Sequence, residues 1–570
     1  MKVTKILIIS LLAVVLSITA CNDEFLEVLP TGQLAEAQLQ SRAGLDGALI
    51  GSYSILLGRG GFYDDASSWF WGSVRGGDAY KGSDAGDQSI VNEVYTYQPQ
   101  STNGEIFSIY ANQYEGIARA NATLKLVSET GEQVSVAEKT RVTAEARFLR
   151  AHYYHHLKKM FNNTPYVDET WNGIDPVPNN QDLYPFIEAD LQFAFDNLPE
   201  QQINVGRANK WAAAAYLGKV YLYQGKYQQA KSMFDQAINN GVNAAGVKYE
   251  LQPNYADLWR TSNDNGPETV FASQAAANTG SINNANPAHV LNFMQGGPGG
   301  CCGFNQPSFD LVNSFRTDAS GLPILDNSYN DPGKALADDN LLASEAAFVP
   351  DQGNIDPRLD HSVGRRGIPY LDWGNHPGRV WIRDYTNGGP YSPKKFVYAQ
   401  NQAGSETDGS SWTPGYTSIN YKIIRFADVL LMAAEAEVEL GNLEAARAYV
   451  NRVRERAANS ALLKEDGNPA ANYVVNLYSS PWSDANTARA AVRMERKIEL
   501  SGEGHRMFDL VRWGIAAPEL NRYIEHNNSK LVASPFSGAS FQSGVDEFLP
   551  IPQQEIDLQG PNVLSQNPGY

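Results

Sequence analysis

Cysteine is nearly absent from this chain, which has three cysteines, Cys21, Cys301 and Cys302, in 570 residues. Two adjacent cysteines and one distant one cannot form a disulfide framework, and no Cys/His array has the spacing of a zinc site. Cys301 and Cys302 are interpreted either as a vicinal disulfide formed in an oxidising compartment or as two free, partly buried thiols.

Positive charge is also scarce. Lys and Arg number 45 against 63 Asp and Glu, which gives a net charge of −18. A protein that binds nucleic acid without regard to sequence needs clustered Lys and Arg to neutralise phosphates, so this class is excluded. The chain is 42% hydrophobic and 11% aromatic, which also excludes an acidic disordered protein.

Long apolar runs are missing after the first twenty residues. The N-terminal run follows Lys2 and Lys5 and extends over residues 6–18. That is shorter than the roughly 20 residues that span a bilayer, so residues 1–20 are interpreted as a signal peptide. The residues before Cys21 resemble a bacterial lipobox, which implies a lipid-acylated Cys21 as the mature N-terminus. The alternative is an ordinary signal peptide with an incidental cysteine.

The familiar catalytic motifs are absent: there is no GxxxxGK[ST], HExxH, GxSxG or Rossmann glycine fingerprint. His152, His155 and His156 share one predicted helix but lack a carboxylate at ligand spacing, so they are interpreted as structural or surface residues. Residues 326–331 offer oxygens for a structural calcium ion, yet without the ordered positions of an EF-hand, and a cluster of Asx turns is favoured. No other cofactor is expected.

Helical periodicity dominates four stretches, so the fold class is predicted to be mainly α. Apolar residues recur at i, i+3, i+4 and i+7 in residues 105–161, 210–239, 423–458 and 487–515. In the second stretch Gly218, Gly225, Ala230 and Phe234 have tetratricopeptide spacing, which predicts two closely packed antiparallel helices. The third stretch repeats the scheme loosely; two unrelated helical hairpins are the alternative.

Two regions rich in Gly, Pro, Asn and Ser interrupt the helices, at 58–97 and 249–416. Residues 269–273 and 395–398 are predicted to be short strands within the second region. Loops of this length in a compact domain are usually functional.

Aromatic residues stand beside polar ones in both regions. The first region has Trp69 and Trp71 followed by Arg75, Asp78 and Tyr80, and the second has Trp373 and Trp381. A sugar ring presents an apolar C–H face and a rim of hydroxyls, so a site for it needs a flat ring with Arg, Asp or Asn partners. These residues are therefore predicted to bind an oligosaccharide. The alternative is that the rings are core plugs beneath long loops.

Several blocks of the chain resemble the SusD/RagB family, and they follow the family's order over nearly the whole mature sequence. The matching blocks are AEARFLRAHYY (144–154), DPRL (356–359), RFADVLLMAAEA (425–436), ERKIELSGEGHRMFDLVRWG (495–514), FLPIP (548–552) and QNPGY (566–570). Within the fourth block Glu499, Glu503, Arg506, Asp509 and Arg512 lie three or four residues apart, which predicts a structural charge network rather than a catalytic site.

The resemblance implies an α-rich fold with four TPR-like helix pairs and a loop-rich region with small β elements. It implies one compact unit after the signal peptide, in two parts, 21–260 and 261–570. It places ligand contacts in the first loop, by position residues 69–80, and in the central insertion, roughly at residues 289–304. The second range adds Phe293 and Phe304 to the candidates. This sequence has Cys301 and Cys302 where the family often has Trp or Tyr, so starch specificity is not carried over.

The function implied by the resemblance is that of a non-catalytic, lipid-anchored protein on the outer face of the outer membrane. Such a protein captures a glycan and hands it to a SusC-like TonB-dependent transporter, and the helical layer is expected to dock on that transporter. Peptide capture is the first alternative. A surface glycosidase, which would need two carboxylates about 5–10 Å apart, is the second.

Overall fold

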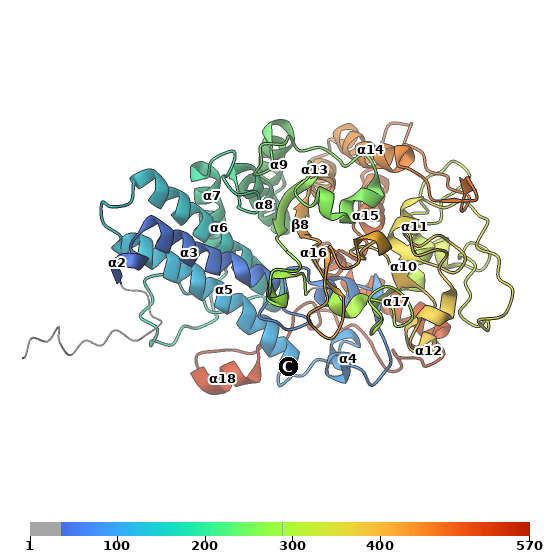
Figure 1. Cartoon of the computed structure of the whole chain (residues 1–570), viewed down its shortest axis with the longest axis horizontal. Helices are drawn as coiled ribbons and strands as arrows, with labels where there is room; N and C mark the ends of the chain where they lie inside the picture. The colour runs from blue at the N-terminus through green and yellow to red at the C-terminus, as the bar shows by residue number, and fades with distance from the viewer. Residues whose placement is uncertain (1–35, 288) are drawn as a thin grey trace, which may run out of the picture.

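The computed structural model describes residues 36–287 and 289–570. The signal peptide, Cys21 and the acylation prediction therefore lie outside the described residues. Helices account for most of the regular structure, so the mainly α prediction is confirmed (Figure 1). No helix in the described ranges combines the length and apolar character needed to cross a bilayer.

The N-terminal half is built from helices that pack in chain order. They are α2 (Glu36–Leu39), α3 (Arg42–Ser54), α4 (Asn92–Tyr95), α5 (Gly104–Glu129), α6 (Val136–Phe161), α7 (Tyr184–Asn197), α8 (Lys210–Tyr223) and α9 (Tyr227–Asn240). From α5 to α9 each helix packs against the next, and α3 lies on α5 and α6. The predicted stretch 105–161 is two helices, because Ser135 caps the start of α6 by accepting a hydrogen bond from the N–H of Glu138.

The predicted pair of close helices is α8 and α9. Gly218 lies directly against the buried ring of Phe234, and a Cβ at residue 218 would stand 2.6 Å from that ring. Gly225 has a φ of +69°, which allows the chain to leave α8 and turn into α9. The spacing of these three residues therefore predicts the local structure correctly.

The C-terminal half continues the helical layer. Its helices are α13 (Phe426–Glu439), α14 (Leu443–Asn459), α15 (Ala485–Glu499), α16 (Arg506–Arg512), α17 (Ala516–Lys530) and α18 (Gln553–Gln559). α13 packs on both α9 and α14, so the layer is continuous across the middle of the chain. The predicted stretch 487–515 breaks after Glu499, where Gly502 and Gly504 both have positive φ.

The central insertion carries short helices and paired strands. The helices are α10 (Phe309–Ser314), α11 (Arg358–Ser362) and α12 (Tyr385–Gly388). Across the described ranges the strands are β1 (Ala79–Gly82), β2 (Thr269–Ser273), β3 (Phe304–Pro307), β4 (Val363–Gly364), β5 (Ser392–Pro393), β6 (Thr407–Asp408), β7 (Tyr416–Thr417), β8 (Tyr421–Arg425), β9 (Lys464–Glu465) and β10 (Asn468–Pro469). They form antiparallel pairs β1–β3, β2–β8, β4–β5, β6–β7 and β9–β10.

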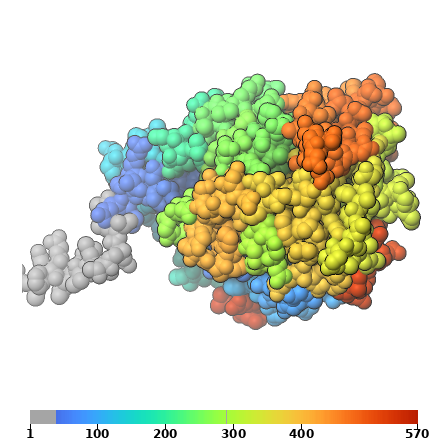
Figure 2. All heavy atoms as spheres, turned by 45° about the vertical axis from the view of Figure 1, so that its right-hand side comes forward, coloured from blue at the N-terminus to red at the C-terminus, as the bar shows by residue number. Residues whose placement is uncertain are grey.

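The strand prediction for 269–273 is confirmed, but that for 395–398 is wrong. Lys395 and Phe396 form a turn, in which Phe396 has a φ of +63° and Lys395 reaches Glu503, and residues 397–398 have no regular structure. The β2–β8 pair has a topological effect, because Ser273 lies opposite Tyr421. The central insertion therefore begins after β2 and ends before β8, at one strand pair. In Figure 2 the yellow and amber atoms of the insertion cover much of the visible face.

A buried charge network joins the insertion to the last helices. Arg425 donates to Glu268, Glu499 and Glu503, and Arg358 donates to Glu499 from the insertion side. Burial alone would raise the pKa of Glu499, but three guanidinium groups outweigh it and hold that pKa well below its usual range. The structural role expected for Glu499 and Glu503 is confirmed.

The second half of the expected network is confirmed only in part. Asp509 accepts from Arg496 and Arg512, and Arg512 also pairs with Glu435. Arg506 does not join it, because its nearest carboxylate is that of Glu519, with 3.9 Å between the guanidinium nitrogen and the oxygen.

Candidate functional site

The two exposed tryptophans among the described residues are Trp171 and Trp412, and of these only Trp412 lies in the loop-rich central insertion. Trp412 is 54% exposed, and its ring meets that of Phe62 edge to face, with 6.4 Å between the ring centroids. We refer to Phe62 and Trp412 as the aromatic ridge. The ridge combines an accessible flat ring with a second ring that fixes its orientation.

Hydrogen bonds hold the loop of Trp412 against other loops of the central insertion. The hydroxyl of Thr413 donates to the carbonyl of Gly299 at 2.9 Å, and the N–H of Gly299 donates to the hydroxyl of Tyr398 at 2.9 Å. Cys301 and Cys302, two residues further along, are joined by a disulfide. Thr413 and Tyr398 therefore hold the loop of residues 299–302 next to the segment that carries Trp412.

The first predicted ring pair does not reach the surface. Trp69 and Trp71 lie in a π-helical turn, η3 (Trp69–Val74), and are 1% and 0% exposed. The indole N–H of Trp71 donates to the carbonyl of Tyr63, so the ring is a core plug, and the prediction that it is an exposed loop ring is wrong. Trp69 donates to the carbonyl of Phe62 at 3.2 Å and thereby supports the ridge from below.

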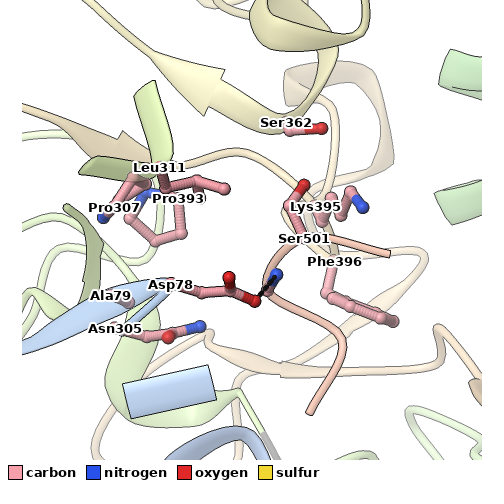
Figure 3. A pocket seen from close by; sticks show the side chains of 11 residues that line it. Asp78, Ala79, Asn305, Pro307, Leu311, Ser362, Pro393, Lys395, Phe396 and Ser501 are labelled. Atoms are coloured by element: carbon pink, nitrogen blue, oxygen red, sulfur yellow. Dashed lines mark hydrogen bonds between the residues drawn. The ribbon is translucent and has the colours of Figure 1, made fainter. Parts of the chain in front are cut away.

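The predicted polar partners of those rings are buried as well. Arg75 donates to the backbone carbonyl of Asp546, and the hydroxyl of Tyr80 donates to the side-chain oxygen of Asn527. Asp78 accepts from the N–H of Gly502 and borders a small cavity of about 20 Å³ (Figure 3). That volume suits a single water molecule, not a sugar ring. These three residues anchor the β1 region to the C-terminal segments instead of lining a rim.

Burial also decides the charge of Asp78. Loss of hydration raises its pKa to about 6, against the opposing effect of Arg506 and of the hydrogen bond from Gly502.

The predicted ligand-binding residues of the insertion differ in their exposure. Phe293 and Phe304 are 1% and 0% exposed, and Phe293 lies beneath Gly415, so both support the loops without facing solvent. Trp373 and Trp381 are half-buried. They flank a small apolar cluster made of Phe293, Met294, Tyr370, Val397 and Tyr398.

A cleft of about 730 Å³ opens beside these residues of the central insertion. It lies between the turn η5 (Tyr255–Trp259) and the loop at 394–406. Its polar lining includes Arg260, His361, Asp372, Lys394, Asn401, Gln402 and Glu406. The volume falls within the range of ligand sites, and the mixture of donors and acceptors suits a polyhydroxylated molecule.

One lysine of the cleft is unusual for its burial. Lys394 donates to the carbonyls of Asp360 and Pro369, and burial lowers its pKa to about 7 even though Asp360 opposes the shift. The charge of the cleft therefore changes near neutral pH.

The other expected features are placed as follows. His152, His155 and His156 are buried in α6, and Asp326 accepts from the N–H and hydroxyl of Ser328, as an Asx turn does. Within residues 36–287 and 289–570 no three His, Cys, Asp or Glu side chains are grouped to hold a metal ion.

Sequence reasoning missed Phe62 and the residues of the cleft as candidate contacts. A signal for the ridge was present, because Trp412 follows Gly409 and two serines and precedes Pro414 and Gly415, while Phe62 follows Gly60 and Gly61. A large ring in such a segment has few neighbours in the chain to bury it.

The family model described as "SusD family" matches residues 267–570. The chain belongs to the SusD family. A second SusD-like model, described as "Starch-binding associating with outer membrane", matches residues 24–222. A SusD-like protein of Formosa agariphila is 27% identical over the full length of both chains.

Solved SusD structures share the fold. The crystal structure of a SusD superfamily protein from Bacteroides vulgatus matches with a TM-score of 0.68 at 21% identity, covering 93% of this chain and 99% of that one. A laminarin binding SusD-like protein matches with a TM-score of 0.64 at 24% identity, covering 93% and 100%. These similarities establish the SusD fold for this chain.

Proposed function

We propose that this SusD family protein binds oligosaccharides at the cell surface without catalysis, and that Trp412 supplies the stacking face. The observation that carries the proposal is the 54% exposure of Trp412, whose ring packs edge to face on Phe62. The structural relative named for laminarin binding and the family model named for starch binding support glycan as the ligand class.

The chemistry of the ridge fits a sugar ring. The apolar C–H face of a pyranose packs on an indole face, and hydroxyls at its rim exchange hydrogen bonds with polar neighbours. Ser411 precedes Trp412 and offers such a group within the same loop, whereas the hydroxyl of Ser410 already donates to Asp408. The 730 Å³ cleft offers Arg260, Asn401 and Gln402 to further sugar units.

The test is isothermal calorimetry of the purified protein with laminari- and malto-oligosaccharides. Trp412→Ala should weaken binding at least tenfold, about 1.4 kcal/mol, while the melting temperature stays close to that of the parent. Trp171→Ala is the matched control, because that ring is 46% exposed but lies in the segment between α6 and α7. Its affinity should be unchanged.

Arg260→Gln separates the ridge from the cleft. If the sugar chain extends into the cleft, this variant also weakens binding, more for longer oligosaccharides than for short ones. Equal affinity in Trp412→Ala and the parent would refute the stacking role. Binding to peptides with no binding to any glycan would refute the proposal as a whole.

We further propose that the protein is anchored by lipid on Cys21, faces outward from the outer membrane and delivers its ligand to a SusC-like TonB-dependent transporter. Lipobox-like residues before Cys21 and the outer-membrane association named for the N-terminal family model support this. Co-purification from detergent-solubilised membranes tests the partnership. Recovery of the protein alone, under conditions that preserve other such complexes, would count against it.

A further inference from the structure

A second cavity, of about 360 Å³, lies among the C-terminal helices and is lined by an excess of positive charge. Four cationic residues line it, and Glu519 is the acidic one. The cationic residues are Arg489, Arg493, Lys497 and Arg506. They come from α15 and α16, not from the loops that carry the aromatic ridge, so the cavity is separate from the site described above.

Two of the four cations have strong partners. Arg489 makes two hydrogen bonds to Glu439, at 2.6 and 2.9 Å, and Lys497 pairs with Asp310 at 2.6 Å. Both charges are thus compensated by carboxylates. The charges of Arg493 and Arg506 must be balanced by other groups.

Arg493 is the one without a direct partner. It has no ion pair or hydrogen bond within the described ranges, and its Nε atom is buried without a partner. Glu435 and Glu439 act on its charge only from beyond ion-pair distance. Its guanidinium carbon lies 4.9 Å from the ring centre of Trp513, so the aromatic ring holds the group in place. Arg506 is nearly as free, because its contact with Glu519 is 3.9 Å long and its side chain is only 12% exposed.

A guanidinium with a buried, unpaired N–H is costly, and an oxyanion offsets that cost directly. The planar fork of an arginine donates hydrogen bonds to two oxygens of a carboxylate, sulfate or phosphate at once. A cavity of about 360 Å³ can hold such a group together with a small molecule attached to it. Burial also lowers the pKa of Arg493, against the opposing effect of Glu435, and the neighbouring Arg489 and Arg512 lower it further.

We propose that this cavity is an oxyanion site in which Arg493 and Arg506 hold a sulfate, phosphate or carboxylate group. The group is either a free ion or the acidic substituent of a sugar. The site is independent of the glycan proposal, because it needs neither the ridge nor the cleft.

The test is calorimetry of the purified full chain with sodium sulfate, sodium phosphate and glucuronate, each at an ionic strength held constant with sodium chloride. Saturable binding of at least one of these anions is expected, with no binding of glucose. Arg493→Gln should weaken binding at least tenfold. Arg42→Gln removes the same charge from a side chain that is 71% exposed on α3, and it should bind as the parent does.

The outcomes separate the two sources of the oxyanion. Binding of glucuronate tenfold tighter than that of sulfate assigns the site to an acidic sugar, and equal or tighter binding of sulfate assigns it to a free ion. If Arg493→Gln does not fold, as judged by circular dichroism, Arg506→Gln takes its place with the same expected loss. Absence of saturable binding, or equal binding by the parent and the variant, would overturn the proposal.

Discussion

Trp71 contacts Phe70 edge to face and has no exposed surface, which sets the cost of removing it. Trp71→Ala leaves a cavity in the core and should lower the free energy of unfolding by about 3–5 kcal/mol. Glycan affinity of the folded protein should stay the same, since the ring cannot meet a ligand. Urea denaturation and calorimetry on this variant check both statements. Weaker glycan binding with unchanged stability would contradict them.

At the residue scale the sequence predicted the kind of side chain but not its exposure. Trp69, Trp71 and Trp412 all lie in segments rich in Gly and Ser. What separates them is contact with distant parts of the chain. Arg75 and Asp78, close behind the first pair, bond to Asp546 and Gly502, more than 400 residues away. No local pattern contains that information.

The α8–α9 helix pair depends on one glycine. A methyl group at residue 218 would stand 2.6 Å from Phe234, whose ring is fully buried and cannot swing away. Gly218→Ala should therefore destabilise the protein by about 1–3 kcal/mol, despite the better helix propensity of alanine. The free energy of unfolding from urea denaturation measures this.

Gly47 is the matched control for Gly218. It also lies in a helix, α3, but has open space where a Cβ would go. Gly47→Ala should be neutral or stabilising by up to about 1 kcal/mol. A Gly218→Ala protein as stable as Gly47→Ala would show that the helices can separate without cost.

At the element scale, periodicity and turn residues predicted the helices well, because those signals are local. The insertion was harder. Residues 269–273 form a strand because β8 lies beside them, whereas residues 395–398, with similar composition, form no strand, and the turn at Lys395 and Phe396 brings Lys395 to Glu503. The difference depends on a partner strand and a buried carboxylate, neither of which is near in sequence.

Over the whole molecule, the chain has eight histidines, and burial lowers the pKa of every one of them. The unfolded chain therefore takes up protons below about pH 6.5 that the folded chain does not. Four aspartates, Asp65, Asp78, Asp264 and Asp339, have pKa values raised to about 6–7 by burial and act in the opposite sense.

The raised pKa values of Asp64, Glu105, Glu145 and Asp546 act in the same sense as those of the four aspartates, whereas Lys394, with a pKa lowered to about 7, acts with the histidines. We expect the histidines to dominate, so that the unfolded state binds more protons between about pH 6.5 and 5 and stability falls as the pH falls through that range. Below about pH 4.5 the depressed carboxylates, such as Asp509 with a pKa of about 2, add to the loss. Urea denaturation at pH 7.5, 6.5 and 5.5 measures the slope. A free energy of unfolding that rises toward pH 5.5 would mean that the aspartates dominate.

The pairing of β2 with β8 makes the central insertion resemble an exchangeable cassette, since both of its ends lie at one two-stranded joint on the helical layer. The residues between those two ends can therefore change without rebuilding the helices. The joint is not the only constraint, however. Arg358 and Lys395 belong to the cassette and bind Glu499 and Glu503 of the layer. A transplanted insertion must carry two cations to those positions, or it leaves the carboxylates buried with fewer partners and weakens its host.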